Sequence, residues 1–289
     1  MFCETNSLPN YVDINGTNKR HSYGKYICIG WNTNGFNSLV KPYNTIFKKV
    51  VIDSIYADFW IISESHCRNE EKIELDSYEV YHHNRKVSDN CRKGSGGIAV
   101  AVNKSVLESH KIVGIFKGDD GQLALKLQNQ LNDLLIGVFG LYLPPDSYVY
   151  GQNAEEFFNS ASVIWENMFD CDLLISAGDL NARTKELIDY CPEIDGSIPL
   201  RSNPDKIKNS HGEAFLTFLK DNRAVILNGR VTQHLNNFTF ISPRGSSVPD
   251  YIFCPFEHYK YCKEVAIVLI RDLINELQIP RRLPFLTIQ

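Results

Sequence analysis

A carboxylate and an amide stand close together in the segment Gly178-Asp179-Leu180-Asn181, directly after the apolar run 172–177. Side chains of a strand alternate between its two faces, so Asp179 and Asn181 are expected on the same face. A carboxylate can hold a proton or a metal ion, and an amide can orient water or a phosphate oxygen. Taken alone, the segment is typical of an ordinary turn.

The same arrangement recurs along the chain and favours phosphoester chemistry at one site. Four more polar residues stand at the ends of apolar runs: Asn32, Glu64, Tyr142 and Asp250. A glutamate at the end of a buried strand is costly unless a cation or hydrogen-bond donors receive it. Each residue alone also fits a plain structural role, such as a turn asparagine or a packed tyrosine. Together they predict a metal and phosphate site.

Short apolar runs and amphipathic segments must position these residues. Eleven runs read as strands: 26–31, 58–63, 78–82, 97–102, 123–127, 134–143, 172–177, 224–227, 238–241, 248–253 and 264–270. Helices are expected over 44–55, over 154–169 behind an Asn153/Glu156 capping box, and from Ser210, which would cap with Glu213. Phe215, Phe218 and Leu219 form the expected buried stripe of the last helix. Mixed strands and helices around one core predict an α/β sandwich.

The composition narrows the class of protein. The chain has 289 residues, 43% of them hydrophobic, and a net charge of −4, so no global positive field indicates nucleic acid. The first 25 residues lack a signal-peptide core and no run is long enough to span a membrane, which predicts an intracellular protein, nuclear or cytoplasmic. None of the eight cysteines forms a Cys-x-x-Cys pair, so neither a zinc site nor a disulfide framework is expected.

In chain order, these residues resemble the endonuclease/exonuclease/phosphatase superfamily. Within it, the chain looks most like the endonuclease domains of LINE-type non-LTR retrotransposons, which are related to apurinic/apyrimidinic endonucleases. The resemblance covers roughly residues 26–255 and includes the segments 94–100, 178–184, 209–212 and 226–230. It implies a four-layer αββα sandwich, made of two packed mixed β-sheets flanked by helices. It also implies a domain over 26–270, after a flexible segment 1–25 and before an atypical or truncated tail 271–289.

The resemblance also implies roles for individual residues. Glu64 would be the principal Mg²⁺ ligand, with Asn32 and Asp250 completing the metal site mostly through water, and Mn²⁺ as a substitute ion. Asp179 would activate the attacking water or protonate the leaving oxygen. The residues expected to contact or support the phosphate and the rest of the substrate are Asn181, Tyr142, Arg183, Thr239 and Arg92.

A basic hairpin precedes the turn at 94–97. Arg85, Lys86, Arg92 and Lys93 face only Asp89 as an opposing charge, so the hairpin could track a DNA backbone. A solvated loop is the alternative. The expected partner is DNA, with no membrane, and the expected state is a monomer.

One part of the family pattern is missing. Family members carry a Ser-Asp-His segment about two dozen residues beyond the equivalent of Asp250, whereas this chain has Asp272-Leu273 there and no histidine after His258. Leucine can neither donate nor transfer a proton. Two functions therefore stay open: an endonuclease that nicks DNA, leaving 3′-hydroxyl and 5′-phosphate ends, with impaired turnover, or an inactive remnant that keeps the fold and residual binding. A phosphatase that acts on a small or lipid phosphoester is a third candidate function.

The remaining histidines have plainer interpretations. His66 shares the face of Glu64 and is expected to support it. Adjacent side chains on a strand point to opposite faces, so His82 and His83 are expected to be a surface pair rather than metal ligands. His211, in the first turn of a helix, is expected at the surface.

Overall fold

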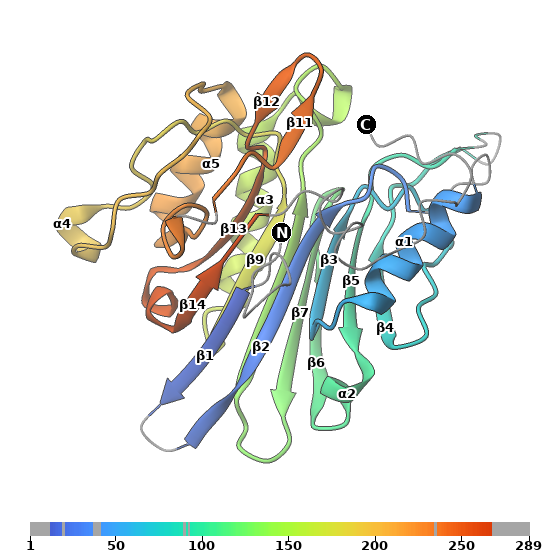
Figure 1. Cartoon of the computed structure of the whole chain (residues 1–289), viewed down its shortest axis with the longest axis horizontal. Coiled ribbons are helices and arrows are strands. Elements are labelled where there is room, and N and C mark those ends of the chain that lie inside the picture. The colour runs from blue at the N-terminus through green and yellow to red at the C-terminus, as the bar shows by residue number, and fades with distance from the viewer. Residues whose placement is uncertain are drawn as a thin grey trace.

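Two six-stranded sheets form the centre of the molecule. In the computed structural model, the described residues are 12–18, 21–36, 42–88, 91, 93–233 and 236–267. The strand order is β14-β1-β2-β3-β5-β4 in the first sheet and β10-β13-β9-β8-β7-β6 in the second. A separate hairpin, β11–β12, projects beyond the end of the second sheet (Figure 1).

The first sheet consists of β1 (Val12–Asn18), β2 (His21–Asn32), β3 (Phe59–Ser63), β4 (Tyr78–His83), β5 (Ile98–Asn103) and β14 (Cys262–Val265). The second consists of β6 (His110–Lys117), β7 (Gln122–Asn129), β8 (Leu135–Tyr142), β9 (Leu173–Asp179), β10 (Ala224–Ile226) and β13 (Asp250–Pro255). The hairpin is β11 (Phe240–Ser242) and β12 (Gly245–Ser247). The helices are α1 (Pro42–Ser54), α2 (Lys104–Leu107), α3 (Ala154–Glu166), α4 (Pro192–Asp195) and α5 (Ser210–Asp221), with 3₁₀ turns η1 (Val149–Gly151) and η3 (Phe256–Tyr261).

Each sheet contains one parallel pair among antiparallel strands. The pairs are β2/β3 and β8/β9, and a helix joins the strands of each, α1 in the first and α3 in the second. A parallel pair needs such a crossover because the chain must return to the same end of the sheet. The carboxyl ends of four strands, two in each sheet, thus become available to build a site.

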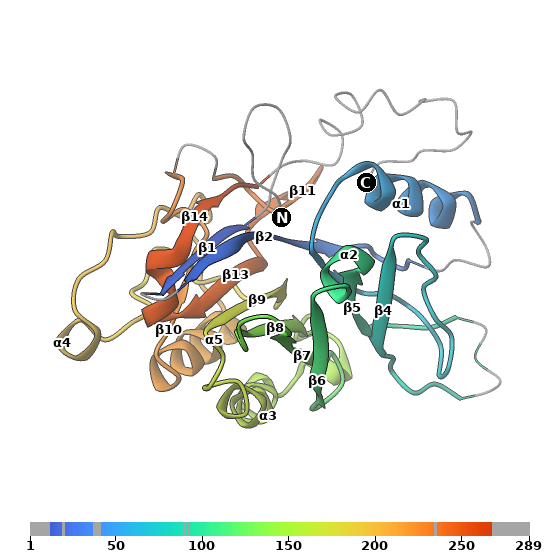
Figure 2. The ribbon, with the colours of Figure 1, turned by 90° about the horizontal axis from the view of Figure 1, so that it is seen from below.

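The layers stack in the order helix, sheet, sheet, helix. Figure 2 shows α1 outside the first sheet and α3 and α5 outside the second. β3 is buried along its whole length: Phe59 and Ile61 face the core between the sheets, whereas Trp60 and Ile62 pack in the core beneath α1. Strands covered on both faces read as continuous apolar runs, as this one does. The four-layer α/β sandwich expected from the sequence is confirmed.

Several local expectations differ from the structure. Strands β1, β6 and β12 were not expected, and β1 with the start of β2 extends the first sheet upstream of residue 26, the expected start of the domain. β6 was missed because its exposed positions Val113 and Ile115 are apolar, so the centre of the strand shows no alternation of apolar and polar residues. Part of the run 264–270 lies outside the described residues, as does the whole tail 271–289.

The expected N-cap of α3 is confirmed, whereas the expected N-cap of α5 is wrong. At α3, Asn153 Oδ1 accepts from the Glu156 backbone N–H at 3.2 Å, which confirms Asn153 as the cap; the Glu156 carboxylate accepts from the Asn153 side-chain amide at 2.6 Å, in place of the backbone N–H of a standard capping box. At α5 the cap is Asn209, whose Oδ1 accepts from the Gly212 N–H at 2.9 Å, rather than Ser210. No helix among the described residues is long and apolar enough to cross a membrane.

Candidate active site at the meeting strand ends

Three neighbouring strands of the second sheet place three polar side chains side by side. In the β8/β9 pair Tyr142 lies opposite Asp179, and in the β9/β13 pair Asp179 lies opposite Asp250. Residues directly opposite each other on paired strands point to the same face. Tyr142, Asp179 and Asp250 therefore form one row at the end of this sheet, although they are far apart in the sequence.

The first sheet supplies the facing residues. Asn32 ends β2 opposite Ser63, the last residue of β3, and Glu64 follows at once. The Asn32 amide donates to Glu64 Oε1 at 2.9 Å and to Asp179 Oδ2 at 2.5 Å. The second of these bonds crosses from one sheet to the other. Asn32 thus joins the two halves of what we call the mouth: Asn32, Glu64, Tyr142, Asp179 and Asp250.

The backbone around Glu64 is held in a rarely populated conformation. Glu64 and His66 have φ angles of 50° and 53°, in the left-handed region that few residues with side chains adopt. The Gly35 N–H donates to the Glu64 carbonyl at 2.8 Å, and His66 Nε2 lies 3.1 Å from Glu64 Oε2. Backbone strain of this kind is typical of functional sites, where surrounding contacts maintain it. His66 supports the Glu64 carboxylate, as its position in the sequence suggests.

The carboxylates of the mouth titrate in opposite directions. Burial acts to raise the pKa of Glu64, but hydrogen bonds from three neighbours, His66, Asn32 and Tyr142, outweigh it and lower the pKa. Burial and then the charge of Asp250 raise the pKa of Asp179 well above its ordinary value. Burial also raises the pKa of Asp250, to about 6. One ionised carboxylate therefore stands beside two that resist ionisation.

Tyr142 is a neutral hydrogen-bond donor in this setting. Burial and the nearby charges of Glu64 and Asp179 raise the pKa of its hydroxyl, and the side chain bonds to Glu64. A phenol that keeps its proton can donate to a phosphate oxygen.

The donor set of the mouth suits a hard cation such as Mg²⁺. It consists of the carboxylate oxygens of Glu64, Asp179 and Asp250, and no lysine or arginine of the described residues forms an ion pair with any of the three. Burial and then the neighbouring carboxylates raise the pKa values of the two aspartates, and a bound cation would favour their ionised forms. The described residues hold no ready cluster of three metal-binding His, Cys, Asp or Glu side chains. Mg²⁺ commonly binds through one or two carboxylates and several waters, so the set fits.

Asn32 and Asn181 are oriented differently from what their sequence positions suggest. Asn32 faces the carboxylates with its amide nitrogen, while its Oδ1 accepts from the Asn34 N–H at 2.8 Å, so water would link it to a metal ion. Asn181 has a φ of 46° and lies two residues beyond Asp179, the last residue of β9, so the extended geometry expected to place the two side chains on one face does not reach it. Its amide donates to the Leu143 carbonyl at 2.9 Å, and its N–H donates to Asp179 Oδ1.

The expected substrate-binding residues fall in three different places. Thr239 supports Asp250, since its Oγ1 accepts from the Asp250 N–H at 3.2 Å. Arg183 forms a two-pronged ion pair with buried Asp205, with Nε···O and Nη2···O distances of 2.8 and 2.7 Å, which commits its guanidinium to the loop after β9. Arg92 lies outside the described residues.

Neither His258 nor His211 takes the place of the histidine that the family pattern has after the equivalent of Asp250. His258 Nδ1 accepts from the Leu174 N–H at 3.0 Å, at the start of β9, whereas Asp179 ends that strand. His211 is only 2% exposed and its Nε2 lies 2.7 Å from the Gly151 carbonyl, so its expected surface position is wrong. The contact with Gly151 places the His211 ring against the segment before α3. The segment 270–273 lies outside the described residues.

His82 and His83 are half-buried rather than a surface pair. His82 Nε2 accepts from the Ile73 N–H at 3.1 Å, and His83 Nδ1 lies 2.8 Å from the Gln122 carbonyl. Each ring is occupied by a different backbone partner, so the pair is not arranged as a metal site.

Two cations lie near the mouth: Lys48, which was not expected there, and Arg85, which was expected in a basic hairpin that could track a DNA backbone. Lys48 of α1 is buried, donates to the Gly35 carbonyl and interacts electrostatically with Glu64, and burial lowers its pKa to about 8. Arg85 is buried beside the 94–97 turn. The only sequence signal for Lys48 is a lysine next to the apolar positions Phe47 and Val51 of the helix.

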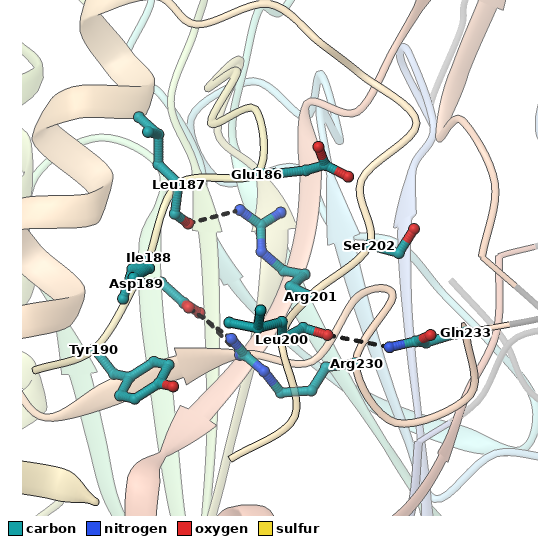
Figure 3. Close-up of a pocket in the computed structure, with 10 residues that line it drawn as sticks. All are labelled: Glu186, Leu187, Ile188, Asp189, Tyr190, Leu200, Arg201, Ser202, Arg230 and Gln233. Carbon is teal, nitrogen blue, oxygen red and sulfur yellow. Dashed lines mark hydrogen bonds and ion pairs between the residues drawn. The ribbon is translucent and has the colours of Figure 1, made fainter. Parts of the chain in front are cut away.

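The described residues enclose a small cavity behind the mouth and a larger one elsewhere. Behind the mouth, a cavity of about 10 Å³ is lined by Asn32, Asp179 and Asp250 among others, and a space of that size holds about one water. A larger cavity, about 380 Å³, lies between the loop after β9 and the segment after β10 (Figure 3). There Arg230 and Asp189 form a buried ion pair at 2.7 Å. The cavity behind the mouth is therefore too small for anything larger than a water molecule.

Comparison with solved structures identifies the fold. The chain is similar to the AP endonuclease LMAP from Leishmania major, with 15% identity, a TM-score of 0.58, and coverage of 80% of this chain and 79% of that one. It is also similar to the 3′-5′ exonuclease NExo from Neisseria meningitidis, with 12% identity, a TM-score of 0.52 and coverage of 78% and 86%. The APE2 catalytic domain from Xenopus laevis gives 16% identity, a TM-score of 0.52 and coverage of 83% and 93%.

By sequence, no protein-family model and no curated protein matches the chain. The structural matches show that the chain has the endonuclease/exonuclease/phosphatase fold, as its motifs suggest.

Proposed function

We propose that this protein is a Mg²⁺-dependent phosphodiesterase that nicks DNA, of the type found in LINE-like retrotransposons. The observation that carries the proposal is the convergence of Asn32 and Glu64 from one sheet with Tyr142, Asp179 and Asp250 from the other. The similar structures include an AP endonuclease and an exonuclease, which favours the same class of substrate for this chain. The motifs 178–184 and 226–230 support the retrotransposon type.

The residues divide the chemistry among them. Glu64 and Asp250 would hold Mg²⁺, with Asn32 contributing through water, and the bound ion would neutralise charge on the phosphate. Asp179, whose pKa is raised, can take a proton from the attacking water or give one to the leaving oxygen. The Tyr142 hydroxyl donates to a phosphate oxygen and Asn32 fixes the Asp179 carboxylate.

The shape of the mouth favours a polymer over a small molecule. The enclosed space behind it admits about one water, so a small phosphoester could not be surrounded there as it is in a deep pocket. DNA can instead lie across an open mouth and be held along its backbone. A phosphatase acting on small phosphoesters is accordingly the weaker candidate.

A second candidate is an inactive remnant that keeps the fold. The histidine expected beyond Asp250 is absent, and His258 is bonded to the Leu174 backbone instead. Loss of one acid/base group typically costs orders of magnitude in rate while leaving binding largely intact.

Nicking of supercoiled plasmid by the full chain, with Mg²⁺ or EDTA, tests the proposal. Wild-type protein should nick only with Mg²⁺. Glu64→Ala should abolish nicking without loss of folding, because it removes the principal metal ligand and a partly buried charge. Nicking that survives Glu64→Ala or EDTA would refute the assignment of the mouth. Silence of the wild type together with nicking by Leu273→His would identify the remnant.

A further inference from the structure

A fixed segment with exposed aromatic side chains follows directly after Tyr142. In Pro144–Gly151, the residues Tyr148, Val149 and Tyr150 are 63%, 78% and 58% exposed. The segment is closely tied down: the Gly151 N–H donates to the Tyr148 carbonyl at 2.8 Å, and the Gly151 carbonyl lies 2.7 Å from His211 Nε2. Large apolar side chains held at the surface on a bonded turn mark a contact surface.

A buried arginine lies against one of these rings. Arg85 Cζ is 4.1 Å from the centroid of the Tyr150 ring, within the range of a cation–π contact. The Arg85 side chain is 5% exposed, and its Nε donates to Asp120 Oδ2 at 3.0 Å. Its Nη2 is buried and has no hydrogen-bond partner among the described residues. A Cβ added at Gly96 would stand 2.7 Å from Arg85 Cζ, so this glycine lets the guanidinium lie against the turn.

The Arg85–Tyr150 pair borders the mouth. The turn that packs against Arg85 also holds the segment after β3: the His66 N–H donates to the Gly96 carbonyl at 2.9 Å and the Ser65 N–H to the Gly97 carbonyl at 3.2 Å. These two residues directly follow Glu64. On the other side, Tyr150 is part of the short segment that begins after Tyr142. The pair is thus connected to the mouth through both sheets.

We propose that Tyr150, with buried Arg85 packed against its ring, binds an unpaired nucleotide next to the scissile phosphate, and that the base stacks on the exposed part of the ring. This inference rests on the proposed function and specifies its substrate class: DNA with an unpaired nucleotide at the cleavage site. Arg85 supports one face of the ring, which leaves the exposed part of the ring for a ligand. A base inside a regular duplex already stacks on its neighbours, so only an unpaired base can use the ring without a cost of unstacking.

The test measures binding of two DNA duplexes of equal length, one fully paired and one with a gap of unpaired nucleotides. The protein carries Asp179→Asn to prevent turnover in Mg²⁺, and 2-aminopurine in the gap reports stacking through its fluorescence. The variants are Tyr150→Leu, which removes the ring, and Tyr150→Phe, which keeps it. Phe169→Leu is the matched control: Phe169 is 67% exposed and precedes β9, about 20 Å of strand away from Asp179.

We expect Tyr150→Leu to weaken binding of the gapped duplex about 5- to 150-fold, with loss of 2-aminopurine quenching and little change for the paired duplex. Tyr150→Phe should restore both signals, and Phe169→Leu should change neither. Equal losses for both duplexes would show that Tyr150 contacts the backbone and would overturn the proposal, as would no loss at all. Plasmid nicking by the protein with Asp179 intact separates failure of this inference from failure of the proposed function. If that protein nicks plasmid but Tyr150→Leu leaves binding unchanged, only this inference is refuted. If the base stacks selectively in the gapped duplex but the protein does not cleave, only the proposed function is refuted.

Discussion

At the scale of single residues, Asp179 concentrates the chemistry of the mouth. It is 5% exposed, lies opposite both Tyr142 and Asp250 in the sheet, and accepts a hydrogen bond from Asn32 across the two sheets. Its raised pKa follows from burial and from the neighbouring charge of Asp250. These conditions suit a group that must exchange a proton, and they are costly in a group that serves only the fold.

The substitution Asp179→Asn tests the role of Asp179 in proton transfer separately from its effect on stability. The amide has nearly the same shape but cannot transfer a proton, so nicking should fall by roughly 100- to 10,000-fold. Stability without metal should stay equal or rise, because the substitution removes the repulsion with Asp250. Plasmid nicking and thermal unfolding in EDTA measure the two effects. A variant that nicks at the wild-type rate would exclude Asp179 as the acid or base.

At the scale of elements, the loop between β9 and α5 is fastened to the second sheet by a buried ion pair. Asp189 accepts two bonds from Arg230, at 2.7 and 3.0 Å, and one from the Ile226 N–H of β10 at 2.7 Å. Both side chains are 1% exposed. Within the same loop, Arg201 Nη2 donates to Thr184 Oγ1 at 2.9 Å, which ties the middle of the loop to the chain just beyond Asn181.

We expect Asp189→Ala to destabilise the protein by about 3–5 kcal/mol, because it leaves the Arg230 guanidinium buried without its counter-ion. Urea unfolding of the full chain measures the loss. The exposed ion pair between Lys206 and Glu186, in the same loop, provides the control, since Glu186→Ala should cost at most about 1 kcal/mol. Equal effects of the two substitutions would show that burial of the Asp189 pair contributes nothing.

At the scale of the whole molecule, the site and the stability of the fold are linked through protons. The pKa values of Asp179 and Asp250 are raised in the folded state, that of Asp250 to about 6. The folded protein therefore binds more protons at these groups than the unfolded chain. Their contribution to stability is present below the ordinary aspartate pKa and is lost as the pH rises through the raised values.

In EDTA, the free energy of unfolding contributed by these groups should therefore be larger at about pH 5 than at about pH 8. Asp250→Asn should reduce this pH dependence, and Mg²⁺ should stabilise the wild type more at the higher pH, where both carboxylates are ionised. Urea unfolding at the two pH values, with and without Mg²⁺, gives the comparison. A wild type and an Asp250→Asn variant with the same pH dependence would contradict the electrostatic account.

The residue patterns of the sequence determined the α/β class and the residue types of the site, and the family resemblance implied the four layers. Continuous apolar runs such as 58–63 predict strands buried on both faces, and the spacing of Phe215, Phe218 and Leu219 predicts a helix packed on a sheet, because burial imposes a period on the chain. The same runs place Glu64, Tyr142 and Asp179 at strand ends, where the structure has them.

Only the tertiary structure decided which of these residues meet and in what state. The bond from Asn32 to Asp179 and the alignment of Asp179 with Asp250 depend on how the two sheets pack and on strand register, which no local pattern encodes. The raised pKa values of the aspartates and the lowered pKa of Lys48 likewise arise first from burial by residues distant in sequence, and the contact of Arg85 with Tyr150 depends on the same packing. Local periodicity fixes which side chains face inward, whereas packing between the layers fixes their partners and hence their chemistry.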